Sequence, residues 1–137
     1  MRSRRVAAST AVIVGLSAVL ASCVLFDPQG NLTLHDVMNA EYDAFDASTQ
    51  EEEISDEVCG EQLDCVEAYS TAEANYYRFE SRLLAEEYWS TLADGFVVNY
   101  IVMDFVGKDA TVTEQLWAMQ ATAGMWNDYE GDYPDRR

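Results

Sequence analysis

Cysteine side chains are the most reactive groups in this sequence, and two of the three lie close together. Cys59 and Cys65 are separated by Gly-Glu-Gln-Leu-Asp. Two nearby cysteines pair in an oxidising compartment, and closing so short a loop contributes roughly 2–3 kcal/mol. A two-cysteine metal site is the alternative, but it lacks further ligands because the only histidine, His35, is far away in the sequence. We therefore expect a structural disulfide, with no metal and no cofactor.

The third cysteine, Cys23, follows a basic segment and then an apolar one. The first five residues contain three arginines, residues 6–21 are uncharged, and the run ends in small side chains at Ala21 and Ser22. The run is short for a membrane span, and a peptidase requires small side chains beside the bond that it cuts. This order of segments is typical of a cleaved export signal.

The stretch Leu20-Ala21-Ser22-Cys23 resembles the lipobox of bacterial lipoproteins. The resemblance implies that the Cys23 thiol receives a diacylglyceryl group, and that cleavage then makes Cys23 the new N-terminus. Each buried methylene of an acyl chain such as palmitate adds about 0.8 kcal/mol to membrane binding. The resemblance predicts a signal peptide over 1–22, a lipidated tether over 23–31 and one domain over 32–137 outside the cell membrane. An ordinary signal peptide or an uncleaved anchor is the alternative.

The expected mature chain is strongly acidic. The whole sequence has 137 residues and a net charge of −17, and three of its eight basic residues lie before Cys23. Five basic residues therefore remain with 25 acidic ones, which gives a net charge of −20. This charge argues against binding to nucleic acid or to an anionic lipid surface. The eight Tyr, five Phe and three Trp indicate a folded domain rather than a disordered chain.

Hydrophobic periodicity predicts an α+β domain with a small three-stranded sheet packed by about three helices. The expected helices cover 33–47, 81–94 with Gly95 after its end, and the segment after a capping box at Thr111. The expected strands are a hairpin, 66–71 with 75–79, and a central strand, 96–106, that is apolar on both faces. A crossover between parallel strands would be right-handed.

The segment from Cys59 onward resembles small lipoprotein domains of actinobacteria. The resemblance rests on the spaced cysteine pair, on Val66-Glu67-Ala68-Tyr69 and on Tyr77-Arg78-Phe79. It implies no particular activity.

Residues 48–64 are rich in Asp and Glu and allow two interpretations. The first is a solvated linker, and the second is a weak calcium site, because hard cations prefer several oxygen ligands. The EF-hand pattern and its central glycine are absent, so we favour the linker.

Arg78 and Arg82 are exceptions on an acidic surface and are the candidate ligand-binding residues. They flank the junction between the second expected strand and the second expected helix, where a small anion or carboxylate could bind. The alternative, which we favour, is local pairing with Glu80, Glu86 or Glu87.

No catalytic signature accompanies these features: the sequence lacks Gly-x-Ser-x-Gly and a glycine-rich phosphate loop. We therefore predict a non-enzymatic, membrane-tethered domain that interacts with a cell-envelope protein or ligand, and the sequence sets no oligomeric state. A cell-envelope enzyme or enzyme accessory is one alternative. A phage- or prophage-encoded lipoprotein that blocks superinfection is another.

Overall fold

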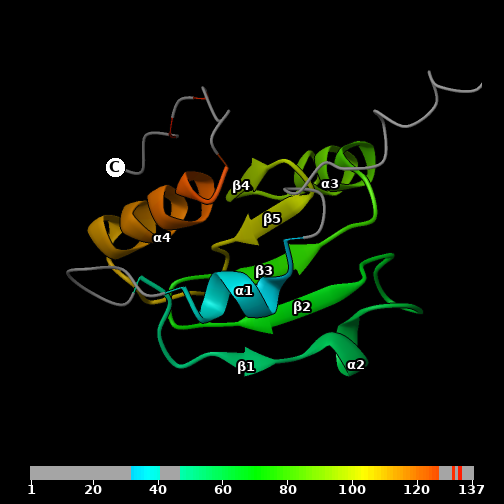
Figure 1. Cartoon of the computed structure of the whole chain (residues 1–137), viewed down its shortest axis with the longest axis horizontal. Coiled ribbons are helices and arrows are strands. Elements are labelled where there is room, and N and C mark those ends of the chain that lie inside the picture. The colour runs from blue at the N-terminus through cyan, green and yellow to red at the C-terminus, as the bar shows by residue number, and fades with distance from the viewer. Residues whose placement is uncertain (1–31, 41–46, 127–130, 132, 134–137) are drawn as a thin grey trace, which may run out of the picture. The chain divides into compact units, whose positions relative to one another are not determined.

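The computed structural model describes residues 32–40, 47–126, 131 and 133. The chain divides into two compact units, residues 1–30 and 31–137, and every described residue belongs to the second. The described part contains five strands and four helices (Figure 1). The strands are β1 (Glu52–Glu53), β2 (Glu67–Ser70), β3 (Asn75–Arg78), β4 (Gly95–Val98) and β5 (Ile101–Asp104). The helices are α1 (Leu34–Met38), α2 (Ser55–Val58), α3 (Arg82–Trp89) and α4 (Val112–Gly124).

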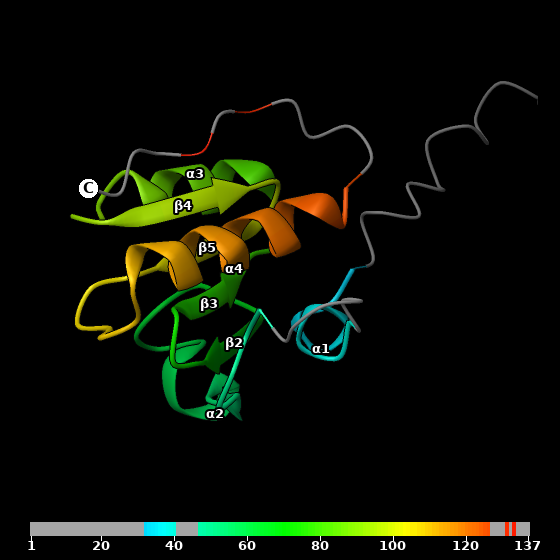
Figure 2. The same ribbon diagram turned by 90° about the vertical axis from the view of Figure 1, so that its left-hand side faces the viewer.

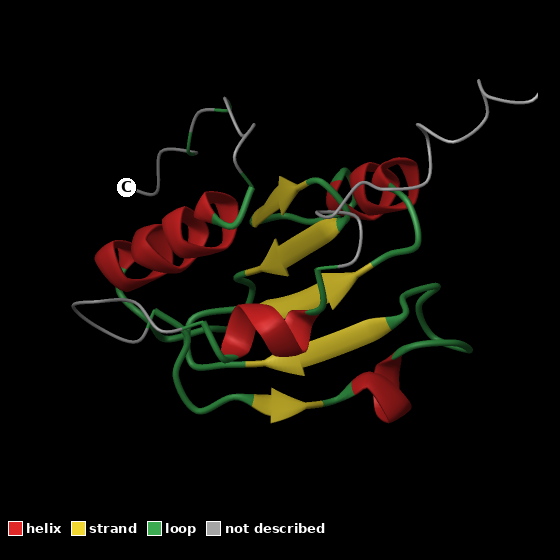
Figure 3. Cartoon of the chain, in the orientation of Figure 1, coloured by secondary structure: helices red, strands yellow, loops and turns green. Residues whose placement is uncertain are grey.

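The strands form one antiparallel sheet in the order β1-β2-β3-β5-β4 (Figure 3). The class is α+β, as predicted, but the expected three-stranded sheet with about three helices is wrong. The predicted hairpin is present as β2 and β3, with Ser70 opposite Asn75. Because β3 pairs antiparallel with β5, the described sheet contains no parallel crossover between them.

The apolar run 96–106 was expected to be one central strand, and it forms two. The chain reverses at Asn99 and Tyr100, so that Val98 lies opposite Ile101 in a tight hairpin. Asn99 has a φ of 52°, a left-handed conformation that Asn adopts more readily than other non-glycine residues. Both faces of this hairpin are covered, so both carry apolar residues. The apolar run is therefore nearly continuous across the turn and does not indicate where the chain reverses.

The acidic segment 48–64 is ordered as β1 and α2 rather than as a linker. The amide of Ile54 donates to the carbonyl of Ala68 at 2.9 Å, which continues the pairing of β1 with β2. The Ser55 hydroxyl accepts a hydrogen bond from the amide of Ala68 at 2.9 Å. This side-chain contact extends the pairing of the segment with β2 beyond β1. Glu52 and Glu53 are exposed on this edge strand, where charged side chains are stable in water.

The two faces of the sheet carry separate hydrophobic clusters. Figure 2 shows the ribbon from a second side, with α1 to the right of β2 and β3. One face packs against α1 and α4, and we call it the α1/α4 face. Its buried sheet residues are Tyr69, Tyr76, Phe96, Val98, Ile101 and Met103. The other, the α2/α3 face, packs against α2, α3 and the segment around the cysteines. Its buried sheet residues are Ala68, Tyr77 and Val102. The sheet is therefore the middle layer of the domain.

The helices differ from prediction mainly at their ends. Of the expected helix 33–47, α1 covers only the first part, and residues 41–46 lie outside the described residues. The expected capping box at Thr111 is confirmed at the start of α4.

Gly95 was expected to follow directly after the end of a helix. Instead, α3 ends at Trp89 and Gly95 begins β4. A Cβ atom there would lie 2.8 Å from the Leu92 side chain and 3.0 Å from the Met103 carbonyl oxygen. The glycine therefore allows the close approach of the chain after α3 to β5.

The β4–β5 turn gives the first prediction. We expect Asn99→Val to lower the free energy of unfolding by about 1–2 kcal/mol, because a β-branched residue resists the left-handed conformation. Asn99→Gly should leave stability nearly unchanged, since glycine adopts positive φ freely. Urea unfolding followed by tryptophan fluorescence measures both variants. Equal destabilisation by valine and glycine would mean that the Asn99 side chain, and not its backbone conformation, holds the turn.

Candidate functional site

The predicted disulfide is confirmed: Cys59 and Cys65 are bonded, with their Cα atoms 4.8 Å apart. Both residues belong to the hydrophobic cluster of the α2/α3 face, together with Ile54, Val58 and Leu63. The disulfide therefore fastens the end of α2 to the beginning of β2. Its role in the described domain is structural.

Residues 1–31, which include the lipobox-like stretch and Cys23, lie outside the described residues. Among the residues that are described, none belongs to a helix with the length and apolar character needed to cross a bilayer. The membrane attachment predicted from Cys23 stays a prediction.

Arg78 pairs across the sheet with Glu67 and not with the expected Glu80, Glu86 or Glu87. The two residues lie directly opposite each other on β3 and β2, and Arg78 Nε lies 2.8 Å from Glu67 Oε2. Their side chains are 24% and 14% exposed, so water screens this pair less than a fully exposed one. Arg82 is exposed at the first position of α3.

The same Glu67 carboxylate also holds the beginning of α1. It accepts hydrogen bonds from the backbone amides of Leu34, at 2.9 Å, and His35, at 3.0 Å. These amides have no partner within the helix, since the first turn of any helix leaves its N–H groups unpaired. Glu67 and Arg78 therefore form a structural junction between α1 and the sheet, and His35 takes part through its backbone only.

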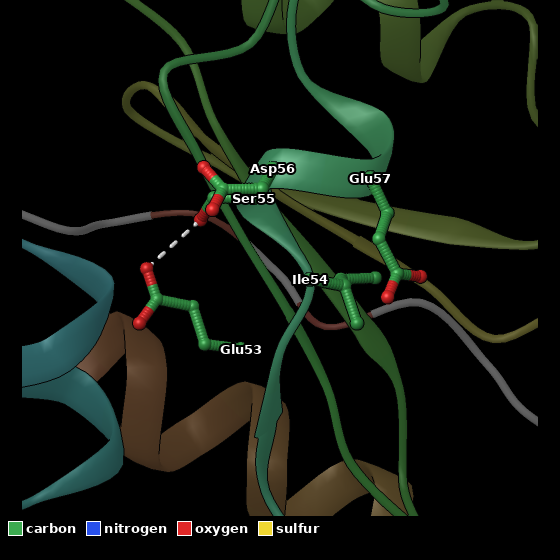
Figure 4. Close-up of a pocket in the computed structure, with 5 residues that line it drawn as sticks. All are labelled: Glu53, Ile54, Ser55, Asp56 and Glu57. Carbon is green, nitrogen blue, oxygen red and sulfur yellow. Dashed lines mark hydrogen bonds between the residues drawn. The ribbon is translucent and has the colours of Figure 1, made fainter.

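A small pocket lies where β1 meets α2, and it is acidic (Figure 4). Its volume is about 260 Å³, and its lining residues are Glu53, Ile54, Ser55, Asp56 and Glu57. The Ser55 hydroxyl donates to Glu53 at 3.2 Å, and the three carboxylates are exposed. Within the described ranges, no three His, Cys, Asp or Glu side chains are grouped so that they could hold a metal ion. The pocket is best read as a solvated acidic surface.

A second polar group, which the sequence did not suggest, lies on the α2/α3 face. Asn75 pairs with Ser70 on one side and with Asp104 on the other, so these three side chains form a row across β2, β3 and β5. All three are partly exposed, whereas Ala68 and Val102 on the same face are completely buried. The row lies at the end of β2, the beginning of β3 and the end of β5. In Figure 1 these strand ends are at the left, and α2 and α3 are at the right. The polar row is therefore less buried than Ala68 and Val102.

Two tyrosines border this row. The rings of Tyr77, from β3, and Tyr88, from α3, meet edge to face with their centroids 5.4 Å apart. The side chains of Tyr88 and Asn75 lie close enough to the Tyr77 hydroxyl to affect its pKa. Burial, together with the nearby Tyr88 and the negative charge of Asp104, raises the pKa of Tyr77 to about 12. Burial and Asp104 also raise the pKa of Tyr88. Both hydroxyls therefore remain protonated at neutral pH.

Lys108 completes the group from the loop that follows β5. Its ammonium group donates to the Ser70 hydroxyl at 2.9 Å and to the carbonyl of Thr71 at 2.7 Å. Partial burial lowers the pKa of Lys108, and the charges of Glu73 and Asp104 oppose that shift. We call Ser70, Asn75, Tyr77, Tyr88, Asp104 and Lys108 the polar cluster.

The polar cluster was missed because its members are scattered over four elements and a loop. One signal was available in the sequence: Asp104 is a charged residue inside the apolar run 96–106. A carboxylate in such a run indicates either an exposed position or a polar environment.

The chain was compared with protein-family models, with curated proteins and with solved structures, and nothing matched in any of the three.

The junction of Glu67 and Arg78 gives the second prediction. We expect Glu67→Ala to lower the free energy of unfolding by about 2–3 kcal/mol, because three donors lose a charged acceptor. Glu80→Ala, which removes an exposed glutamate near Arg78 in the sequence, should change it by less than about 0.5 kcal/mol. Two double-mutant cycles, in which each change is combined with Arg78→Ala, are measured by urea unfolding. They give the coupling energy of Arg78 to Glu67 and to Glu80 separately. Stronger coupling of Arg78 to Glu80 than to Glu67 would refute the assigned pair.

The raised pKa of Tyr77 gives the third prediction. Its folded-state pKa, about 12, lies above the ordinary 10.0, so the folded protein holds this proton more tightly than the unfolded chain. The resulting stability is fully present below pH 10 and is lost as the pH rises towards 12. We expect Tyr77→Phe to flatten the fall of Tm over this range, as measured by alkaline thermal scans. An unchanged slope in the variant would show that other groups cause the loss.

Proposed function

We propose that the chain is a lipid-anchored, extracytoplasmic domain that binds a ligand or partner without catalysing a reaction. The observation that carries the first part is the Cys59–Cys65 disulfide, built into the core of the α2/α3 face. Such bonds persist in the oxidising compartments to which the predicted signal and the lipobox-like stretch would direct the chain. Lipidation of Cys23 would then keep the domain at the membrane.

The chemistry of the described residues supports binding rather than catalysis. The single histidine, His35, is exposed on α1. An exposed histidine on a five-residue helix is poorly suited to act as an oriented general base for a Ser or Cys nucleophile, which supports the proposal. The hydroxyls of Tyr77 and Tyr88 have raised pKa values, so they are suited to hydrogen bonding and not to attack as phenolates at neutral pH.

The acidic surface restricts the class of partner. With a net charge near −20 after removal of the predicted signal, the domain repels polyanions and anionic membrane surfaces. A lipid anchor is compatible with that repulsion, since acyl chains bind the bilayer interior rather than its charged headgroups.

The fourth prediction tests the anchor. We expect Cys23→Ser to release the protein from the membrane fraction or to leave an uncleaved precursor, because serine offers no thiol for acylation. Fractionation of cells and immunoblotting measure both outcomes, and Asp109→Asn, a change at an exposed position that keeps all three cysteines, is the control. Processing and membrane retention of Cys23→Ser as in the wild type would remove lipidation from the proposed function.

A further inference from the structure

We propose that Asp94 is a site of spontaneous isoaspartate formation, and that the indole of Trp89 controls its rate. Asp94 precedes Gly95, and this is the only Asp-Gly pair in a sequence that contains no Asn-Gly pair. Glycine has no side chain, so its amide nitrogen is the least hindered backbone nucleophile that an aspartate can precede. The proposal concerns a covalent modification of the chain and is independent of the lipid anchor and of the binding role.

The reaction is a cyclisation that needs no partner except water. The Gly95 amide nitrogen attacks Cγ of the protonated Asp94 carboxyl group, so that a C–N bond forms and a C–O bond breaks. The hydroxyl group leaves with the amide proton as water, and the product is a five-membered imide. A water molecule then opens the imide at the former backbone carbonyl. The chain now continues through Cγ, with one methylene group added to its backbone and no change in mass.

Asp94 lies at a part of the fold that opens easily. It is exposed in the bend directly before β4, and Gly95 is the first residue of that strand. In the described sheet β4 is an edge strand, so only β5 pairs with it. The ends of such strands open at a low free-energy cost, since few contacts hold them.

The hydrogen-bond pattern leaves the attacking amide on the outer side of the sheet. The Phe105 amide donates to the Asp94 carbonyl at 3.0 Å, so the backbone of Asp94 faces the chain after β5. Successive residues of an edge strand direct their backbone groups alternately toward the partner strand and away from it, so those of Gly95 point outward. The Gly95 carbonyl has this direction, because it accepts from the Trp89 indole at 3.0 Å.

Two hydrogen bonds oppose the reaction. Ring closure turns the peptide group between Asp94 and Gly95 toward the Asp94 side chain. That rotation displaces the Asp94 carbonyl from the Phe105 amide, and the Gly95 carbonyl from the Trp89 indole. Both bonds must open before the nitrogen reaches Cγ, so a weaker hold by Trp89 would make the reaction faster.

The experiment is ageing of the full chain for several weeks at neutral pH and physiological temperature, followed by trypsin digestion. One tryptic peptide, 83–108, contains both Asp94 and Asp104. Isoaspartate is located in it by electron-transfer fragmentation and quantified with an isoaspartyl methyltransferase. We expect it to accumulate at Asp94 and not at Asp104, because the amide that follows Asp104, that of Phe105, is bulkier and is bonded inside the sheet. No isoaspartate at Asp94, or as much at Asp104, would overturn the proposed site.

Trp89→Phe should raise the rate at Asp94 about fivefold, because it removes one hydrogen bond of ordinary strength and keeps an aromatic ring. Trp117→Phe makes the same change at an exposed tryptophan of α4 and should leave the rate unchanged. A rate in Trp89→Phe equal to that of Trp117→Phe would overturn the control by the indole.

Asp94→Glu is a second test that does not require the Trp89 variant to fold. Its side chain would have to close a six-membered ring, which forms far more slowly, so the variant should keep its Tm during ageing. The Tm of the wild type should fall, since the added methylene group shifts β4 away from its contacts. An equal change of Tm in the two proteins would overturn the proposal.

Discussion

The shared carboxylate of Glu67 is the contact on which the arrangement of this domain depends. A helix of five residues, such as α1, is not stable in isolation, because nucleation costs more than so few hydrogen bonds return. Glu67 supplies acceptors for the first amides of α1, and Arg78 fixes the position of that carboxylate across the strand pair. Leu34 and Val37 are then buried on the α1/α4 face, at 0% and 2% exposure. One ionic junction thus allows a short helix to cover part of the sheet.

The sheet ends on both sides in strands that are poor templates for further pairing. β1 is only two residues long and carries two exposed glutamates, which disfavour another strand alongside. At the other edge, the Trp89 indole donates to the outward-facing carbonyl of Gly95 at 3.0 Å. Trp89 itself is 42% exposed. The Trp89 indole thus occupies a backbone acceptor of the edge strand β4, which a further strand would otherwise need.

Local signals in the sequence predicted local structure well. The β2–β3 hairpin, the capping box of α4 and the Cys59–Cys65 bond all depend on residues close together in the chain, and all three are present. The failures involve contacts between distant residues. The role of β1 depends on pairing with β2, the partner of Arg78 lies eleven residues away on another strand, and the polar cluster joins residues from 70 to 108. No periodicity within a single segment encodes such contacts.

The turn between β2 and β3, residues 71–74, contains no glycine, yet the two strands pair in one defined register. The Thr71 hydroxyl accepts from the amides of Glu73 and Ala74, which satisfies the turn from within. The buried Glu73 carboxylate accepts from the amide and hydroxyl of Thr49, which ties the turn to the chain before β1. Side-chain hydrogen bonds therefore replace the backbone freedom that glycine would provide.

The position of α1 next to the N-terminal chain has a mechanical consequence. Any pulling force that enters the domain through Leu32 reaches α1 and the Glu67 carboxylate before it reaches a strand. The short helix would detach first, at the cost of a few hydrogen bonds and a small buried surface. The paired strands behind it would keep their ladder and the Cys59–Cys65 bond. A force applied to the chain at Leu32 would therefore unfold α1 before it separates the strands of the sheet.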